Sequence, residues 1–342
     1  MAVTQNSLIE NTTIGCDLYI KSYVNGVPRF VLFCRGGEIF GNERKEELIS
    51  KNINKLFIPT RNLKTYFKYQ ENNLKSVITD KKKTSQEKSH VVYHVAKYLA
   101  QDLLSDPRSG TNIGRVTNWV DNTVSYILHD SNAFSTLLKV TAHDYYTYTH
   151  SVNLAVLGLL FGKHIALNPH NLNSLGIGML LHDVGKIEIP LEILNKPGKL
   201  TNEEFELAKK HVEIGIRILE EKKDLAEESR IIVSQHHENH NGTGYPNRIG
   251  GNDIHLFGNI SRIIDVYDAI TTNRPYRIAK KPFKALVEMK EKMPDCFDQE
   301  LFKEFIYFLG PKKVQETQEA SGFPNSNEAE LRSSARKTWS SG

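Results

Sequence analysis

The feature that most constrains this chain is a set of seven ionisable residues on the apolar faces or at the ends of predicted helices. His211, for example, is flanked at helical spacing by Leu207 and Ile214, and Asp265 lies inside the apolar segment RIIDVYDAI. A buried carboxylate with no partner is costly to desolvate, so each of these groups needs one. One such histidine alone is more often a core residue with a single hydrogen bond than a ligand. A shared cation explains the whole set, which is His150, His182, Asp183, His211, His236, His237 and Asp265.

The types of these residues restrict the metal. Imidazole nitrogen and carboxylate oxygen suit zinc, manganese and iron, and seven ligands exceed the three or four protein ligands of one catalytic ion. Two divalent transition-metal ions are therefore expected. The three cysteines, Cys16, Cys34 and Cys296, are odd in number and widely separated, which predicts neither a disulfide framework nor a thiolate zinc site.

The pattern along the chain predicts a mainly α protein, with an all-helical bundle that follows a small N-terminal α+β module. Before residue 80, the segments DLYIKSYV, RFVLFCRG and KLFIP alternate as strands do, and NERKEELISKN reads as a helix between them. After Lys81–Lys83 the periodicity is helical throughout. We expect an α+β module at 1–80, a helical linker at 81–140, a helical domain that carries the seven candidate ligands at 141–310 and a disordered tail at 311–342.

Two local signals refine this picture. Thr201 and Glu204 form a capping-box pattern that starts one long helix, NEEFELAKKHVEIGIRILEE. In HHENHNGTGYPNRIG, two histidines at a helix end precede Gly242 and Gly244, which allow a sharp turn before Tyr245. We interpret this stretch as a metal grip joined to a substrate-binding rim. The alternative is a turn tyrosine that packs on the domain surface.

Composition and charge exclude some classes of protein. The longest apolar run, LAVLGLLF at 154–161, is too short to span a bilayer, so we predict a soluble, cytoplasmic protein with no membrane insertion. The net charge of +4 over 342 residues lacks the dense basic stripe of a protein that binds a nucleic-acid polymer.

Several motifs occur in one order: HDVGK at 182–186, HHE and GYP at 236–246, and RPYR at 274–277. Together they resemble the HD-GYP branch of the HD phosphohydrolase superfamily over roughly residues 140–310. The resemblance implies a phosphodiesterase that hydrolyses cyclic di-GMP, a bacterial second messenger, to pGpG or GMP through a hydroxide bridging two metals, iron or manganese. It assigns the same seven residues as ligands, with Asp183 bridging the metals.

The resemblance also implies roles for residues beside the metals. Lys186 would stabilise the transition state or protonate the leaving oxygen, and Asp183 and Lys186 would form the catalytic pair. Substrate would be contacted by Tyr245, Arg274, Arg277 and Asp268. The alternatives are that Lys186 is an exposed lysine in a glycine-containing turn and that the two arginines are solvated.

Two positions depart from the family pattern. Tyr146 replaces a glutamate that helps some members hold a third metal, which favours two metals here. Asn241 replaces the usual aspartate of the HHE segment and loses its charge, which weakens loop order or substrate affinity. A low-turnover cyclic di-GMP receptor or protein-interaction module therefore stands as an alternative, and a general HD nucleotide phosphohydrolase stands as a third.

The N-terminal module lies where family members carry sensory or regulatory domains. On its position alone, we expect it to regulate the enzyme or to bind other signalling proteins. The apolar helices of 85–140 need a partner face, which favours a homodimer.

Overall fold

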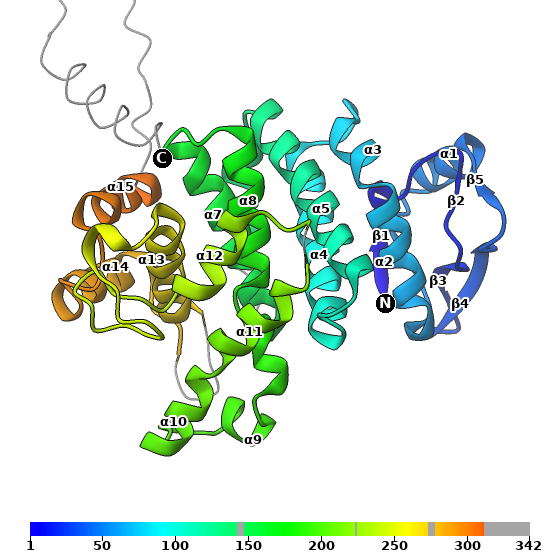
Figure 1. Ribbon diagram of the computed structural model, residues 1–342. Coiled ribbons are helices and arrows are strands. Elements are labelled where there is room, and N and C mark those ends of the chain that lie inside the picture. The colour runs from blue at the N-terminus through cyan, green and yellow to red at the C-terminus, as the bar shows by residue number, and fades with distance from the viewer. Residues whose placement is uncertain (142–146, 223, 273–277, 311–342) are drawn as a thin grey trace, which may run out of the picture. The chain divides into compact units, whose positions relative to one another are not determined.

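The computed structural model describes residues 1–141, 147–222, 224–272 and 278–310. The chain forms two compact units, Met1–Val152 and Asn153–Gly342, and the division falls inside helix α7 (Thr147–His164). Figure 1 shows helices in both units and strands in the first. The prediction of a mainly α chain with a small N-terminal α+β module is confirmed.

A small antiparallel sheet opens the first unit. Its strands run in the order β1-β6-β3-β4, while β2 pairs with β5. The β3–β4 hairpin turns through Asn25 and Gly26, whose φ angles of 51° and 78° suit a tight two-residue turn. The predicted strands correspond to β3, β4 and β6. The bounds are β1 (Ala2–Thr4), β2 (Thr12–Thr13), β3 (Leu18–Val24), β4 (Val27–Cys34), β5 (Ile39–Phe40) and β6 (Lys55–Phe57).

Helices complete the core of the module and continue beyond it. Leu18, Phe40, Leu48 and Tyr66 are buried in one cluster, which joins the strands to α1 and α2. Helix α4 starts with a capping box in which Thr84 and Glu87 satisfy each other's backbone N–H. The bounds, with η for a short 3₁₀ helix, are η1 (Gln5–Ser7), α1 (Asn42–Ser50), η2 (Thr60–Asn62), α2 (Leu63–Asn72), α3 (Leu74–Thr79), α4 (Ser85–Ser105), α5 (Gly110–His129) and α6 (Ala133–Thr141).

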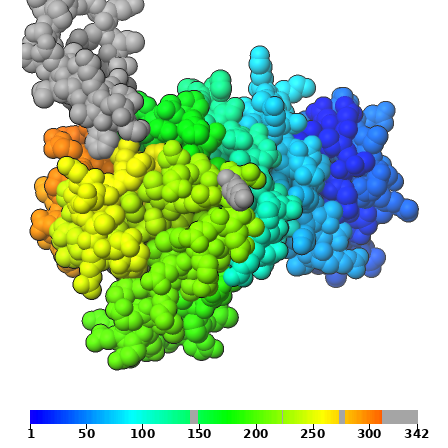
Figure 2. All heavy atoms as spheres, in the orientation of Figure 1, coloured from blue at the N-terminus to red at the C-terminus, as the bar shows by residue number. Residues whose placement is uncertain are grey.

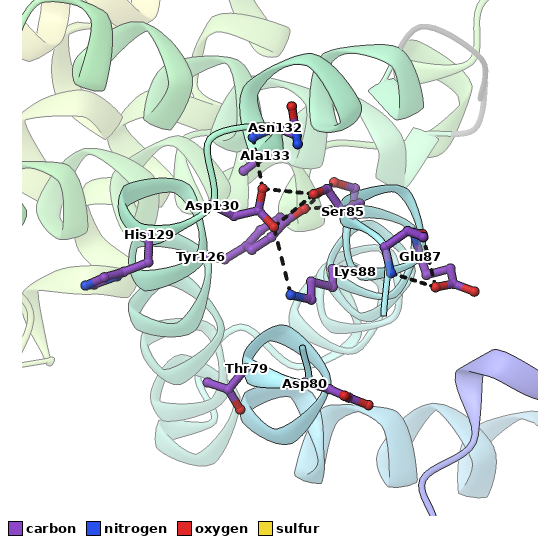
Figure 3. A network of polar contacts seen from close by, with 12 residues as sticks. Thr79, Asp80, Ser85, Glu87, Lys88, Tyr126, His129, Asp130, Asn132 and Ala133 are labelled. Atoms are coloured by element: carbon purple, nitrogen blue, oxygen red, sulfur yellow. Dashed lines mark hydrogen bonds and ion pairs between the residues drawn. The ribbon is translucent and has the colours of Figure 1, made fainter. Parts of the chain in front are cut away.

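Asp130 ties three of these helices together (Figure 3). Its carboxylate accepts hydrogen bonds from Ser85 Oγ at 2.9 Å and from the Asn132 N–H at 2.9 Å, and it lies 3.9 Å from Lys88 Nζ. Tyr126 donates to the Ser85 carbonyl at 2.7 Å. The carboxylate therefore lies at the start of α4, where the helix dipole favours negative charge, and it fixes the α5–α6 turn there.

The second unit is a bundle in which α12 is central, packing against α8, α11 and α13. Gly178 of α8 allows the close approach of α12, because a Cβ there would lie 2.8 Å from the Ser229 carbonyl oxygen. The bounds are α8 (Pro169–Leu181), η3 (Val184–Glu188), α9 (Leu191–Leu194), α10 (Asn202–Lys209), α11 (His211–Glu220), α12 (Glu227–Gln235), η4 (Gly251–Asp253), α13 (Leu256–Thr271), α14 (Pro282–Lys292) and α15 (Gln299–Leu309).

The prediction of one continuous helix after Thr201 is wrong in one respect. The capping box of Thr201 and Glu204 is present, but the helix breaks at Lys210, whose ψ is −16°. The Lys210 N–H bonds to the Leu207 carbonyl, three residues back, which tightens the last turn of α10. α11 then starts at His211 and packs against η3.

A membrane-spanning helix is absent from the described part of the chain, where none of the helices combines the length and apolar character that crossing a bilayer needs.

Candidate metal centre

The HDVGK motif lies where the apolar helix α8 stops. Asn168 caps the start of α8 by accepting the Asn171 N–H, and Pro169 occupies its first turn. The helix ends at Leu181, and Asp183 precedes η3. His182 and Asp183 are 1% and 6% exposed. The carboxylate is therefore held inside the protein at the junction of two helical segments.

Four predicted ligands meet at this junction. Asp183, His211, His236 and His237 each offer a ligand atom, and these atoms lie within 4.8 Å of one another. Asp183 Oδ1 is 3.4 Å from His211 Nε2 and 3.9 Å from His236 Nε2. The three segments involved are the start of α11, the end of α12 and the end of α8, which pack together as described above.

Backbone carbonyls orient these imidazoles. Nδ1 of His211 lies 2.7 Å from the Ala208 carbonyl oxygen, and Nδ1 of His236 lies 3.0 Å from that of Val233. A carbonyl can only accept, so each Nδ1 carries the proton and each Nε2 presents a lone pair. The two Nε2 atoms nevertheless face each other at 3.3 Å, next to a carboxylate. Such converging acceptors fit a cation, and carbonyl-oriented histidines are typical of metal ligands.

A second group of potential ligand atoms comprises His150, His182 and Asp265, also within 4.8 Å of one another. His182 Nδ1 lies 2.8 Å from the Met179 carbonyl oxygen, the same arrangement as in the first group. His237 Nδ1 lies 3.8 Å from Asp265 Oδ2 and so links the two groups. All seven residues predicted as ligands fall in one group or the other.

Burial sets the protonation of the cluster. It lowers the pKa of His236 from 6.5 to about 3 and, as the largest cause, also lowers those of His211 and His237. Burial opposes the ionisation of Asp183, but the charges of His182 and Lys186 hold its pKa well below the ordinary value. The folded protein therefore keeps three neutral histidines beside a carboxylate, the protonation that metal binding requires.

The metal-free protein is expected to lose stability in mild acid. A lowered histidine pKa contributes stability that is present above 6.5 and lost as the pH falls through the window down to about 3. Each affected histidine removes up to about 1.4 kcal/mol per pH unit within that window. Thermal unfolding in chelator at about pH 7.5 and pH 5.5 measures the effect.

His211→Gln should flatten that pH dependence, because it removes one of the titrating groups. His170→Gln, at an exposed position of α8, serves as the matched control and should leave the dependence unchanged. Equal Tm values for the wild-type protein at both pH values would contradict the expectation.

Two other predicted site residues lie beside the cluster. Lys186 donates a hydrogen bond from Nζ to Asp183 Oδ2, and its side chain is 39% exposed, so it joins the buried carboxylate to the surface. Tyr245 stacks on His237 with ring centroids 4.5 Å apart and planes at 27°. Burial, and then the charges of Asp265 and Asp183, raise the pKa of Tyr245, which keeps its hydroxyl protonated and able to donate.

Three of the predictions fall outside the described residues: Tyr146, Arg274 and Arg277. Asp268 is 3% exposed, and its Oδ1 accepts a hydrogen bond from Asn153 Nδ2 at 3.0 Å. Asn241 uses the acceptor that it shares with aspartate, because its Oδ1 accepts from Thr243 Oγ1 at 2.6 Å. The turn before Tyr245 is thus held without a charge at position 241.

The glutamate of the HHE motif is a buried acid to which the sequence analysis gave no role. Glu238 follows the two histidines, is 1% exposed and accepts the Asn247 N–H at 2.7 Å. It anchors the far side of the loop that carries Tyr245, whose peptide bond to Pro246 is cis. Its place directly after two candidate ligands was the available signal.

Residues 128–301, about half of the chain, match the HD domain family. The cyclic di-GMP phosphodiesterase PA4108 of Pseudomonas aeruginosa is 34% identical over 220 residues, which are 63% of this chain and 52% of that protein. The cyclic di-GMP phosphodiesterase of Thermotoga maritima is 32% identical over 164 residues, 48% of this chain and 45% of that protein.

Two further proteins are similar to this chain. The 3′3′-cGAMP-specific phosphodiesterase 2 of Vibrio cholerae is 48% identical over 98 residues, 28% of this chain and 19% of that protein. The solved structure of Bd1817, a HDG"Y"P protein from Bdellovibrio bacteriovorus, superposes with a TM-score of 0.64 at 20% identity, covering 90% of this chain and 99% of that one. The similarity to Bd1817 shows a shared fold and nothing further.

The chain belongs to the HD domain family, and its motifs with these matches place it in the HD-GYP branch. It covers 52% of the length of the Pseudomonas aeruginosa relative and 45% of that of the Thermotoga maritima relative.

Proposed function

We propose that this chain is a metal-dependent phosphodiesterase of cyclic dinucleotides, with cyclic di-GMP as its substrate. The observation that carries the proposal is the convergence of Asp183 and three neutral imidazoles, with Lys186 and Tyr245 at its edge. The relatives named as cyclic di-GMP phosphodiesterases support the choice of substrate.

The seven residues of the two groups would hold two divalent ions, iron or manganese, with Asp183 shared between them. When bound, such ions supply acidified water and positive charge at a phosphate. We propose two ions rather than three because Tyr146 stands where some family members have a glutamate that helps to hold a third metal.

The chain's own side chains would act on the reacting phosphodiester. Hydrolysis adds water across the P–O3′ bond, leaving a 5′-phosphate and a 3′-hydroxyl, so the departing oxygen needs a proton. Lys186 is an ammonium at the edge of the site and can give that proton or stabilise the charge that develops there. The hydroxyl of Tyr245 can donate a hydrogen bond to a phosphate oxygen. Arg274 and Arg277 would offer forked donors to the phosphates.

Asp268 fits a different role from the predicted substrate contact. A ligand could reach this 3% exposed carboxylate only if its bond with Asn153 opened. We propose that Asp268 positions α13 against α7, one helical turn after Asp265.

Incubation of metal-loaded protein with cyclic di-GMP, 3′3′-cGAMP and a mononucleotide, followed by chromatography of the products, tests the function. Linear pGpG or GMP from cyclic di-GMP is the expected result. Faster cleavage of 3′3′-cGAMP would reassign the substrate toward that of the Vibrio cholerae relative. Cyclic di-GMP bound but unchanged would favour the receptor that Asn241 suggests, and turnover of mononucleotides alone would overturn the proposal.

The first unit would regulate this activity or bind other signalling proteins. A groove of about 760 Å³ within it offers a place for a ligand and is lined by residues that include Lys64, Lys68, Asp102 and Arg115. Arg115 is already paired with Glu71 and Asp102, both at 2.8 Å. Homodimerisation through the helices of 85–140 remains part of the same proposal and is measured by light scattering.

A further inference from the structure

Phe205 is an exposed aromatic side chain beside the candidate active site that no role above explains. It lies on α10, with 47% of its surface exposed, and its ring meets Tyr245 edge to face at a centroid distance of 6.2 Å. Tyr245 in turn stacks on His237 at 4.5 Å. Two ring-to-ring contacts therefore separate Phe205 from a candidate metal ligand.

Lys209 lies beside both rings. Its Nζ is 5.3 Å from the centroid of Phe205 and 5.6 Å from that of Tyr245, distances typical of cation–π contacts. It also pairs with Glu206 Oε1 at 2.6 Å, but Glu206 is 67% exposed. The Lys209 side chain is 21% exposed, but the Glu206 carboxylate is open to water, which weakens the pair, so an incoming phosphate can displace Glu206 at little cost.

The position of Phe205, more than its exposure, points to a ligand. Exposed apolar residues are common, and Leu191 of the neighbouring α9 is 68% exposed. Phe205 instead shares a rim with a tyrosine and a cation. Figure 2 shows the surface of α9 and α10, green at the bottom of the view, projecting from the body of the second unit.

We propose that Phe205 and Lys209 form a second binding lip for the cyclic dinucleotide, in which Phe205 stacks on a guanine base and Lys209 faces a phosphate. The inference rests on the proposed function and adds a specificity-determining role to it. A cyclic dinucleotide presents flat bases and two phosphates, and an aromatic ring with an adjacent ammonium matches both. Phe205 and Lys209 stand four residues apart on α10, so one helical face carries the whole lip.

Steady-state kinetics with two substrates test the lip. Phe205→Leu should raise KM for cyclic di-GMP about 10-fold while kcat changes less than about twofold, because one base loses its stacking surface. Phe205→Trp should retain the wild-type KM. Hydrolysis of methyl p-nitrophenyl phosphate, which has no nucleobase, should be unaffected by Phe205→Leu. If Phe205 acted only by holding Tyr245, cleavage of this small diester would fall as well, and that result would overturn the proposal.

Lys209→Gln has a matched control in Lys210→Gln, at the exposed position next to it. The first variant should raise KM about 5-fold and weaken the salt dependence of binding, and the second should do neither. Leu191→Ala should leave every parameter unchanged. An equal effect of Leu191→Ala and Phe205→Leu would mark a general apolar patch and would overturn the lip.

Calorimetric titration with cyclic di-GMP separates this proposal from the proposed function. If the wild-type protein binds cyclic di-GMP without turnover, the proposed enzymatic activity is refuted. The proposed lip still stands in that case if Phe205→Leu weakens the binding of cyclic di-GMP by about the factor expected for KM. A wild-type protein that neither binds nor cleaves cyclic di-GMP overturns both, and wild-type turnover with an unaltered Phe205→Leu variant overturns the lip alone.

Discussion

Replacing Asp183 with asparagine is expected to abolish turnover and to reduce metal affinity more than about 100-fold. Loss of a residue that only hydrogen-bonds to a metal ligand costs about 10–100-fold in affinity, and loss of a ligand should cost more. The substitution keeps the shape of the side chain but removes the charge that lies 3.4 Å from His211 Nε2 and 3.9 Å from His236 Nε2. The first group would keep three neutral imidazoles but no carboxylate of its own. Metal content by elemental analysis and product chromatography measure the two losses.

The fold should survive this change. Asp183→Asn removes a charge that is costly to bury, which stabilises the fold, and it removes the ion pair with Lys186, which destabilises it. The two effects on stability therefore oppose each other. Circular dichroism and Tm of the metal-free variant check this point. Asp253→Asn, at an exposed position of η4, is the matched control and should bind metal and turn over normally. Full metal occupancy in Asp183→Asn would remove Asp183 from the site.

Much of the candidate metal centre was predictable because a buried polar group leaves a local signal. His211 and Asp265 stand out as charged or polar groups at positions where helical periodicity requires apolar ones, and the structure finds both buried. His236 was selected instead as one of two histidines at a helix end, and it is fully enclosed. Periodicity reports which face of a helix is buried, so it marks a candidate ligand where a polar residue falls on that face.

The rim of the site was less predictable because it depends on packing between segments far apart in sequence. Phe205 and Lys209 look like ordinary members of an amphipathic helix until α10 is placed beside the loop of Tyr245. The break at Lys210 has the same origin. The segment NEEFELAKKHVEIGIRILEE carries no proline to end a helix there, and the contact of α11 with η3 is known only from the tertiary structure.

Gly185→Ala is expected to destabilise the protein by about 3 kcal/mol, at the upper end of the usual cost of overpacking a core. A Cβ at this position would lie 1.9 Å from the carbonyl oxygen of His211 and 2.5 Å from the backbone N of Gly215. Backbone atoms cannot rotate away as a side chain can, so η3 and α11 would have to separate. The glycine of HDVGK is thus required for packing, independently of any contact with substrate.

That separation should also impair the metal centre, because His211 is the first residue of α11 while Asp183 directly precedes η3. The free energy of unfolding, measured by chemical denaturation, and the metal content should therefore both fall in Gly185→Ala. Gly114→Ala is the control, since a Cβ there meets nothing within 4 Å, and it should stabilise α5 by up to about 1 kcal/mol. A Gly185→Ala protein with wild-type stability would mean that η3 and α11 do not meet backbone to backbone, and the geometry that brings Asp183 to His211 would then have to be abandoned.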